Sequence, residues 1–298
     1  MKPALIIGST CVDIIINIPH LPVTQEDIHP TAQTMTVGGC SHNVAYIARL
    51  LGTDCTHISP VGTGMYGDYI TKCLNEDGVP ITVRVPDQEN GCCYCLVEES
   101  GERTFMSYHG AEYLFKKEWM KSYAAEDFGL CYICGIEVEE PTGYEMIEYL
   151  EENPCLQVFF APGPRLKHIE KDKIERILAL HPILHINELE ASALSGKEDI
   201  KEAGRHLYAL TKNSVIITLG SQGTFCIEKD GKEHLIPSVP VEHVVDTIGA
   251  GDSHAGTVIA CLTKDMSLTD SVAYANKVAA AVVGVQGIKL EKSQLPAM

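Results

Sequence analysis

A glycine-rich segment near the C-terminal end of the chain reads Asp246-Thr-Ile-Gly249-Ala250-Gly251-Asp252-Ser253-His254-Ala255-Gly256, and an amphipathic run follows it to Leu262. A glycine-rich turn that enters a helix directs several free N–H groups at one point, where the helix dipole adds partial positive charge. The turn therefore predicts an anion-binding site. Asp252 inside it fits two interpretations, a simple helix N-cap or a general base beside a transferring phosphoryl group.

The rest of the chain alternates apolar, β-rich runs with helical stretches. This alternation predicts an α/β fold, with a central, mainly parallel β-sheet and helices on both faces. We expect strands over residues 4–8, 56–61, 130–134, 157–161, 183–187 and 214–219. We expect helices over residues 43–51, 66–77, 141–151, 171–180, 188–194, 200–212, 252–262 and 268–283.

Two stretches, residues 12–37 and 82–108, interrupt the alternation and resemble extended ribbons. The second contains a predicted strand over residues 92–98, a turn at residues 99–102 and a further strand from Arg103 to Ser107. Together they predict either a small β-sheet flap outside the main sheet or an ordinary edge hairpin. We expect one domain over residues 1–298, with these stretches as its lid.

Composition and charge limit the function. The 298 residues are 45% apolar and 21% charged, which is typical of one globular domain with a large core. The formal charge of −17 makes a nucleic-acid partner a poor candidate, although a nucleotide can still be held by local amides and a metal ion. No apolar run is long enough to span a membrane. The twelve scattered cysteines indicate reduced thiols and a cytoplasmic location.

The segment from Asp246 to Gly256 resembles the C-terminal signature D-T-x-G-A-G-D-x-x-x-G of the ribokinase (PfkB) family of sugar and nucleoside kinases. Three further motifs are similar to that family's and follow its order along nearly the whole chain. They are Gly38-Gly39-Cys40-Ser41-His42-Asn43 before a helix closed by Leu51-Gly52, Asn187-Glu188-Leu189-Glu190, and Thr218-Leu219-Gly220-Ser221-Gln222-Gly223.

The resemblance implies a ribokinase-like fold and an ATP-dependent, Mg²⁺-requiring transfer of phosphate to a hydroxyl group. It implies Asp252 as the general base and the amides of Gly249, Ala250 and Gly251 as the anion hole. It places the sugar on Asp13, Gly38, Gly39, Asn43 and, with less support, Glu137. It places ATP along Asn187, Thr218, Gly220, Gly223 and Asn276, Mg²⁺ near Glu190 through water, and a monovalent cation such as K⁺ at Asp246 and the Ile248 carbonyl.

Two of these positions also have a physical reason in the sequence. Adjacent glycines at 38 and 39 let a substrate approach the backbone where a Cβ would collide. Asp13 lies among β-branched residues, where burying an unpaired carboxylate is costly, so sugar hydroxyl groups are expected to satisfy it; a solvated strand end is the alternative. The chain departs from the family at residues 161–165, Ala-Pro-Gly-Pro-Arg, where many members have Asp-Pro.

Other motifs have simpler explanations. Gly62-Thr-Gly64-Met-Tyr-Gly67 fits the dinucleotide fingerprint, but that fingerprint normally follows the first strand of a fold. Cys131 and Cys134 form a lone C-x-x-C without further ligands, and the single helical histidine His254 is expected to be packed or solvated.

These patterns together predict a sugar kinase with a small-molecule sugar or nucleoside substrate, and with neither a nucleic-acid nor a membrane partner. A nucleoside kinase on the same fold stays open, with Tyr94, Phe105 and Tyr108 as candidates to stack a base. A non-catalytic binding protein is the rival from another class. The family resemblance also implies a homodimer through the lid.

Overall fold

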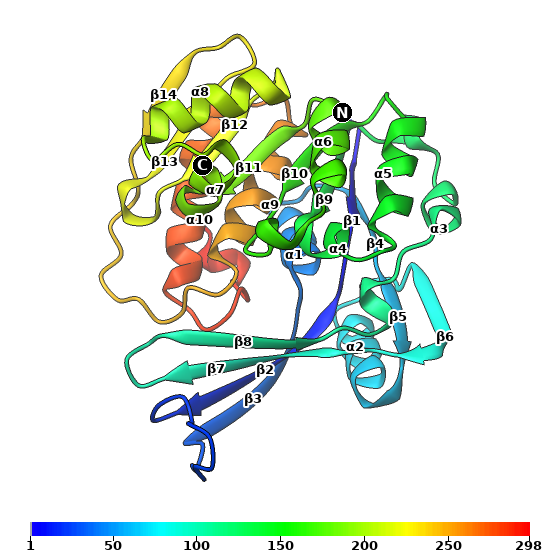
Figure 1. The fold of residues 1–298 in the computed structure, drawn as a ribbon, viewed down its shortest axis with the longest axis vertical. Coiled ribbons are helices and arrows are strands. Elements are labelled where there is room, and N and C mark those ends of the chain that lie inside the picture. Colours follow the sequence, from blue (N-terminus) through cyan, green and yellow to red (C-terminus); the bar gives the residue numbers. More distant parts are fainter. Residues whose placement is uncertain (1) are drawn as a thin grey trace. The chain divides into compact units, whose positions relative to one another are not determined.

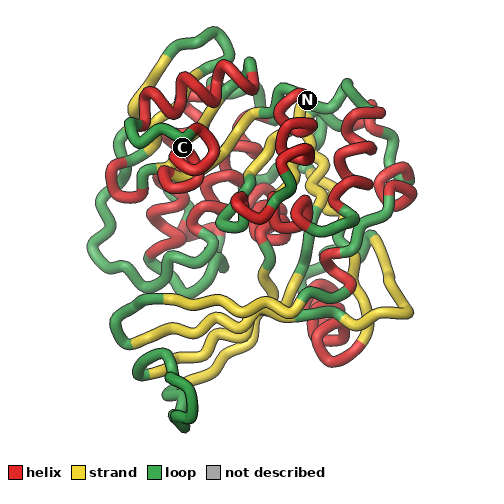
Figure 2. Tube along the Cα trace, viewed as in Figure 1, coloured by secondary structure: helices red, strands yellow, loops and turns green. Residues whose placement is uncertain are grey.

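The computed structural model of the protein describes residues 2–298, which divide into two compact units (Figures 1 and 2). The large unit contains residues 2–7, Asn43–Ile58 and Phe115–Met298. The small unit contains Gly8–His42 and Ser59–Leu114. Both stretches expected to form a lid, residues 12–37 and 82–108, therefore lie in the small unit.

The large unit is built on an eight-stranded sheet in the order β14-β13-β12-β11-β10-β9-β1-β4. Neighbouring strands from β4 to β12 in this order run parallel, whereas β13 and β14 are antiparallel. Its strands are β1 (Ala4–Ile7), β4 (Cys55–Ile58), β9 (Leu130–Cys134), β10 (Gln157–Ala161), β11 (Ile183–Asn187), β12 (Val215–Thr218), β13 (Thr224–Ile227) and β14 (Glu233–Ile236). The predicted α/β class with a mainly parallel sheet is confirmed.

Helices cover both faces of this sheet, as the residues of β13 illustrate. Phe225 lies against Gly204 of α8, while its neighbour Thr224 hydrogen bonds to Asn276 of α10 on the opposite face. The helices are α1 (Cys40–Leu50), α3 (Lys117–Lys121), α4 (Gly135–Glu139), α5 (Gly143–Glu152), α6 (Lys171–Ala179), α7 (Glu188–Ser195), α8 (Ile200–Thr211), α9 (Ala250–Leu262) and α10 (Leu268–Val283). In Figure 1 the green helices α5 and α6 lie in front of the sheet.

Local sequence explains where several helices begin. The Asp199 side chain accepts a hydrogen bond from the Glu202 N–H (2.9 Å), and Ser267 accepts one from the Asp270 N–H (3.1 Å). Such N-caps satisfy amides that a helix leaves without an internal partner. Every helix expected from the sequence is present to within three residues at each end.

The small unit contains two further sheets and one long helix. A four-stranded sheet has the order β3-β2-β7-β8, and β5 pairs in parallel with β6. The strands are β2 (Cys11–Ile18), β3 (Ala32–Gly38), β5 (Pro60–Thr63), β6 (Val83–Glu89), β7 (Cys92–Glu98) and β8 (Arg103–Tyr108), and the helix is α2 (Gly64–Glu76). The separate four-stranded sheet confirms the flap and rules out the simple edge hairpin.

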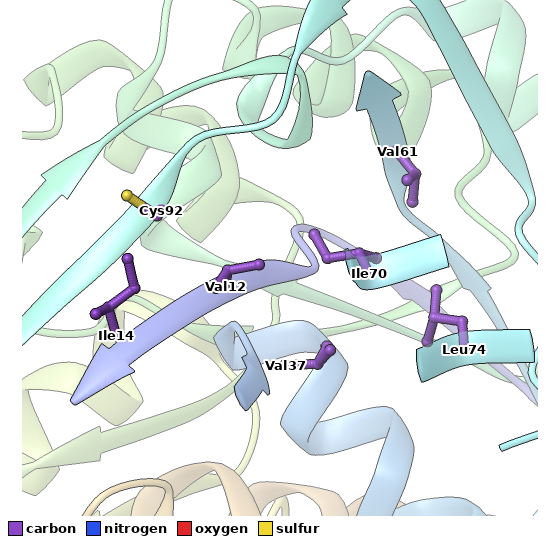
Figure 3. Close-up of a cluster of buried hydrophobic side chains, with 7 residues drawn as sticks. All are labelled: Val12, Ile14, Val37, Val61, Ile70, Leu74 and Cys92. Atoms are coloured by element: carbon purple, nitrogen blue, oxygen red, sulfur yellow. The ribbon is translucent and has the colours of Figure 1, made fainter. Parts of the chain in front are cut away.

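One face of the four-stranded sheet packs against α2. Figure 3 shows this core, with side chains from β2, β3, β5, β7 and α2: Val12, Ile14, Val37, Val61, Ile70, Leu74 and Cys92. Burying one aliphatic side chain contributes roughly 1.5–3 kcal/mol, so this cluster stabilises the unit. Residues on β2 alternate between the faces, and Asp13 therefore points away from this core.

Three details of the sequence prediction are wrong. The single strand expected over 56–61 is two strands, β4 in the large unit and β5 in the small unit. The stretch 82–108 does not join one sheet, because β6 pairs with β5 rather than with β7. The antiparallel hairpin of β13 and β14 was missed, although Asp230-Gly231, with Gly231 at a φ of +88°, is a hairpin turn signal.

The glycines of Gly62-Thr-Gly64-Met-Tyr-Gly67 have a packing role within the small unit. The Gly62 N–H donates to Asn90 Oδ1 (2.6 Å), and a Cβ on Gly67 would approach the Gly62 carbonyl oxygen to 2.5 Å. Close contact at the entry to α2 therefore accounts for these glycines without a dinucleotide.

Two findings concern the whole described chain. None of the helices within residues 2–298 combines the length and apolar character that crossing a bilayer requires. All twelve cysteines are free thiols, as expected, and Cys131 and Cys134 are buried within β9.

Candidate active site

Asp252 lies in the first turn of α9, the helix that the glycine-rich segment enters. Its carboxylate is half-buried, and its Oδ2 accepts a hydrogen bond from the Asn43 side-chain N–H at 2.7 Å. A hydrogen bond from an amide to an ionised carboxylate is stronger than one between neutral groups. Asp252 is thus held in one orientation by a residue 209 positions away in the sequence.

The turn before α9 requires glycine at its first position. Gly249 has a φ of +72°, a left-handed conformation, and a Cβ there would collide with the Ile288 side chain. The N–H of Ala250 donates to the Thr247 carbonyl oxygen at 3.3 Å, so part of the predicted anion hole is engaged within the turn. Gly251 is exposed, and a Cβ there would meet nothing within 4 Å. The open side of the turn therefore lies at Gly251.

Asn43 reaches Asp252 because α1 and α9 pack closely. A Cβ on Gly256 of α9 would lie 2.7 Å from the Val44 carbonyl oxygen of α1, so only glycine permits this approach. Asn43 is 5% exposed, and its Oδ1 has no hydrogen-bond partner among residues 2–298. A buried acceptor of this kind is available to a ligand donor.

Asn187 and Glu190 form a capping box at the start of α7. Glu190 N–H donates to Asn187 Oδ1 (2.8 Å), while Asn187 donates from its backbone to Glu190 Oε2 (3.0 Å) and from its side chain to Oε1 (2.8 Å). Burial raises the pKa of the Glu190 carboxyl, the hydrogen bonds from Asn187 oppose that shift, and the negative charge of Asp252 adds to it. The two carboxylates therefore lie within electrostatic reach of each other.

The candidate nucleotide residues gather near the ends of β11 and β12. Asn187 and Thr218 are register partners at the carboxyl ends of these parallel strands, where α/β folds bind ligands. Gly220 has a φ of +57° with open space beside it, and Gly223 has a φ of +99°. Asn276 is buried, and its Nδ2 donates to the carbonyl oxygens of Ile236 (3.3 Å) and Pro237 (3.0 Å).

Asp246 connects the segment before α9 to the turn at residues 283–287. Its Oδ1 accepts from the Ile248 N–H (2.8 Å) and its Oδ2 accepts from the Gly287 N–H (3.0 Å). The N–H groups of Val245 and Asp246 donate to the Val283 carbonyl oxygen (2.9 and 3.2 Å). The segment around Ile248 and the 283–287 turn are therefore fastened together.

Two further positions lie after strands of the large unit. Glu137 is fully buried in α4, immediately after β9. Arg165 makes a two-pronged ion pair with Glu139, with its side chain partly exposed. An arginine fork on a carboxylate is a stable arrangement in itself, which accounts for Arg165 without a phosphate.

In the small unit, Asp13 lies over Gly38. A Cβ on Gly38 would collide with the Asp13 carboxylate, and a Cβ on Gly39, whose φ is +102°, would approach the Ser9 carbonyl oxygen to 2.7 Å. The paired glycines therefore make room for Asp13 itself as well as for any ligand. Register across β3, β2, β7 and β8 places Thr36, Asp13, Cys93 and Ser107 side by side on one face, hereafter the Asp13 row.

The side chains that could bind a metal ion are scattered over the part of the chain that the structure describes. Among residues 2–298, no three His, Cys, Asp or Glu side chains converge as a metal site would require. Mg²⁺ in phosphoryl-transfer enzymes usually binds through one or two carboxylates, substrate phosphates and several waters. Glu190, half-buried near Asp252, fits such a contribution, whereas a dedicated protein cage does not fit this chain.

Sequence reasoning missed the surroundings of His254. The side chain is buried, and it contacts His185, Thr224 and Asn276. His254 was expected to be packed or solvated, and the structure shows it packed. Its polar partners gave no signal in the sequence, because they come from three other elements. The contact between Asn43 and Asp252 was missed for the same reason.

The chain is similar in sequence to known carbohydrate kinases. The sequence profile of the pfkB family carbohydrate kinases matches residues 1–293. The uncharacterized sugar kinase YegV of Escherichia coli is 32% identical over 290 residues, which cover 96% of this chain and 90% of YegV. Mouse ribokinase is 27% identical over 307 residues, covering 98% of this chain and 93% of its own.

Solved structures share the fold. Ribokinase from Thermotoga maritima has a TM-score of 0.84 at 23% identity, covering 100% of this chain and 97% of its own. Arabidopsis thaliana ribokinase complexed with ribose and ATP has a TM-score of 0.78 at 21% identity, covering 99% and 96%. Burkholderia thailandensis nucleoside kinase in complex with inosine has a TM-score of 0.78 at 20% identity, covering 98% and 92%.

Proposed function

Because the chain belongs to the pfkB family of carbohydrate kinases, and is thus a ribokinase-like phosphotransferase with an alcohol group as acceptor, we propose that it transfers the γ-phosphoryl group of ATP to a hydroxyl group of a small sugar. Asp252 is the general base in this proposal. The observation that carries it is the hydrogen bond from Asn43, which aims the Asp252 carboxylate within the first turn of α9.

The chemistry follows from this placement. The sugar hydroxyl gives its proton to Asp252 as its oxygen bonds to the γ-phosphorus, and the bond from that phosphorus to the ADP oxygen breaks. In this proposal the N–H groups of Gly249 and Gly251, together with the α9 dipole, stabilise negative charge on the transferred oxygens. Ala250 contributes once its weak bond to Thr247 opens.

Nucleotide binding is assigned to the ends of β11 and β12. ATP would lie along Thr218, Gly220 and Gly223, with Asn187 near the phosphates and Asn276 behind the adenine pocket. Mg²⁺ held by the phosphates would neutralise their charge, with Glu190 acting on it through water. Asp246 and the Ile248 carbonyl, already fastened to the 283–287 turn, would hold a monovalent cation such as K⁺.

The Asp13 row supports a sugar as the acceptor. Its side chains are small and polar, which suits hydroxyl groups, and Gly38, Gly39, Asn43 and Glu137 would complete the sugar site. Tyr94 packs against the apolar core on the opposite face, and Tyr108 pairs with Cys92 of that core face. Two of the three aromatic candidates for stacking a base therefore point away from Asp13.

A nucleoside kinase is the second candidate, and one observation favours it. Phe105 pairs with Cys95, which places it on the Asp13 face, and it is 55% exposed. An exposed ring there would stack a nucleobase.

The four-stranded sheet is proposed as a lid and as a dimer surface. Closure over the substrate would exclude water that otherwise accepts the phosphoryl group. Met106 and Tyr108 expose large side chains on one face of β8, which an identical lid of a second copy would cover. Sedimentation showing only monomer at micromolar concentration would contradict the dimer. The twelve free thiols support a cytoplasmic location.

The test is an ADP-release screen over pentoses, hexoses, keto-deoxy sugar acids and nucleosides, with and without K⁺. We expect ATP-dependent turnover with at least one sugar, and turnover lowered by about 10²–10⁴ with Asp252→Asn. Turnover with nucleosides alone would favour the second candidate. Nucleotide binding without turnover on any acceptor would favour a non-catalytic binding protein.

A further inference from the structure

Four buried polar side chains form a continuous hydrogen-bonded chain inside the large unit. They come from four elements: His185 of β11, Thr224 of β13, His254 of α9 and Asn276 of α10, each less than 9% exposed. His185 Nε2 lies 2.9 Å from His254 Nδ1, and His254 Nε2 lies 3.2 Å from Asn276 Oδ1. Thr224 Oγ1 donates to Asn276 Oδ1 at 2.7 Å.

The orientation of the Asn276 amide fixes the direction of the hydrogen bonds among these side chains. Asn276 Nδ2 donates to the Ile236 and Pro237 carbonyl oxygens, so its Oδ1 can only accept. His254 Nε2 must therefore carry the hydrogen. Burial lowers the pKa of His254 to about 4, so the ring is neutral, and its bare Nδ1 accepts from His185 Nε2. Two backbone carbonyls thus set the tautomers of both histidines.

The chain connects parts of the proposed site. His254 lies two residues after Asp252, and His185 lies two residues before Asn187. The carbonyls that hold Asn276 border the glycine turn of the nucleotide region. A Cβ on Gly223 would lie 2.9 Å from the Pro237 carbonyl carbon, and Ser238 Oγ donates to the Ser221 carbonyl oxygen. Asn276 and His254 therefore link the 236–238 segment to the first turns of α9.

Burying the polar imidazole of His254 costs desolvation free energy, and an apolar ring of similar size at this position would avoid that cost. Buried polar networks are costly unless every member is bonded, and their gain over an apolar core lies in fixing one arrangement. Stability alone therefore does not account for these four hydrogen-bonded side chains.

We propose that His254 is a positioning residue, which keeps the base-bearing turn of α9 aligned with the nucleotide-binding turn through Asn276. This inference rests on the proposed function, since it assigns the nucleotide to the turn at residues 220–223. His254 touches neither substrate, and its effect passes through Asn276 on one side and the backbone of α9 on the other.

The test compares His254→Phe with His254→Gln, which keeps an N–H donor for Asn276. For each variant, the affinity for ADP with Mg²⁺ is measured by calorimetry, and kcat and both KM values are measured with the acceptor that the screen selects. We expect His254→Phe to weaken ADP binding about tenfold, raise KM for ATP, lower kcat, and leave KM for the sugar within about twofold. His254→Gln should restore most of the ADP affinity.

His57→Phe is the matched control, because His57 is also a buried histidine of the large unit, on β4. It should lower thermal stability without changing either KM. Unchanged ADP affinity and KM values in His254→Phe, or a glutamine variant no better than phenylalanine, would overturn the proposal.

Two further outcomes are distinguished. If His254→Phe does not fold, His185→Phe decides the question with the same measurements and an expected loss of ADP affinity of about threefold. Absence of turnover by the wild-type protein would count against the proposed function alone, because the comparison of ADP affinities needs no acceptor.

Discussion

The first turn of α9 and the Asp13 row each centre on an aspartate, but the two carboxylates are held in different ways. Asp252 receives a short hydrogen bond from a buried amide, and the neighbouring acids Glu190 and Asp246 accept bonds from backbone N–H groups. Asp13 instead lies beside small side chains and receives a hydrogen bond from the Cys11 thiol at 3.5 Å. A carboxylate offers about four acceptor sites, so the hydroxyl groups of a sugar are chemically suitable partners for Asp13.

The Cys93 thiol lies between Asp13 and Ser107 in the Asp13 row. Burial raises its pKa to about 11, its hydrogen bond with Ser107 opposes the shift, and the charge of Asp13 adds to it. Phosphoryl transfer requires charges fixed in advance, whereas substrate recognition requires groups that a ligand can complete. The difference between the two regions therefore predicts that substitutions in α9 change kcat and that substitutions in the row change KM.

The largest effect is expected from Asp252→Asn. Loss of the base should lower kcat by about 10²–10⁴ with a smaller change in the sugar KM, measured by steady-state ADP release. Asp265→Asn is a matched control, because Asp265 follows α9, is exposed and has a φ of +59°, which asparagine tolerates. Near-normal turnover by Asp252→Asn would remove that residue from its role.

Asn43→Ala should lower kcat by about 10–100-fold. The substitution removes a hydrogen bond to a charged group, which is worth roughly 1.5–3 kcal/mol, and lets the Asp252 carboxylate rotate. Single-turnover kinetics would separate this loss in the chemical step from a change in ATP binding. A variant that altered only the sugar KM would place Asn43 with the substrate and outside the support of the base.

Asp13→Ala should raise the sugar KM by about 10–100-fold and leave the ATP KM unchanged, because hydrogen bonds from hydroxyl groups to a carboxylate are lost. Thr34→Ala, on the same face but two residues from the row, provides the control. A fall in kcat with an unchanged sugar KM would show that the two regions do not divide the work as described.

Stability should depend on pH through the buried histidines of the large unit. Folded His254 protonates near pH 4 and an unfolded histidine near pH 6.5, so the unfolded state binds more protons between these values. Stability therefore falls as pH drops from 6.5 towards 4, by about 2 kcal/mol between pH 7.5 and 5 for this residue. Urea unfolding of the wild type and His254→Phe at both pH values should differ by that amount; equal pH dependence would contradict a neutral, buried His254.

The smallest effect is expected from Phe105→Ala. For a sugar substrate, an exposed ring contributes little, and both kinetic constants should stay within about twofold of wild type. A base stacked on this ring would instead lose on the order of 1–1.5 kcal/mol, which raises a nucleoside KM about tenfold. The result sharpens the choice between the two substrate classes.

Much of the fold was accessible from the sequence because its signals are local. Glycine turns, capping residues and the alternation of apolar runs identified α9, α7 and the parallel strands, and the extended ribbons identified the small unit's sheet. The boundary between β4 and β5 was not predicted, because one continuous extended stretch, residues 55–63, supplies strands to two units.

In the candidate site, too, local features were predicted from the sequence and long-range contacts were not. Motifs located Asp252, Asn187 and Gly223, since each lies where a strand or turn meets a helix. The contacts that orient them are long-range: Asn43 is 209 residues from Asp252, and His185 is 69 residues from His254. No spacing in the sequence reports such contacts, because they depend on how helices and strands pack.

A structure with ADP, Mg²⁺ and the sugar selected by the screen would test the central claim most directly. We predict the acceptor hydroxyl within hydrogen-bonding distance of the Asp252 carboxylate, about 2.6–3.2 Å, with the phosphate end of the nucleotide facing the amides of Gly249 and Gly251. A sugar bound with every hydroxyl beyond reach of Asp252, or a nucleotide whose phosphates point away from the start of α9, would contradict it.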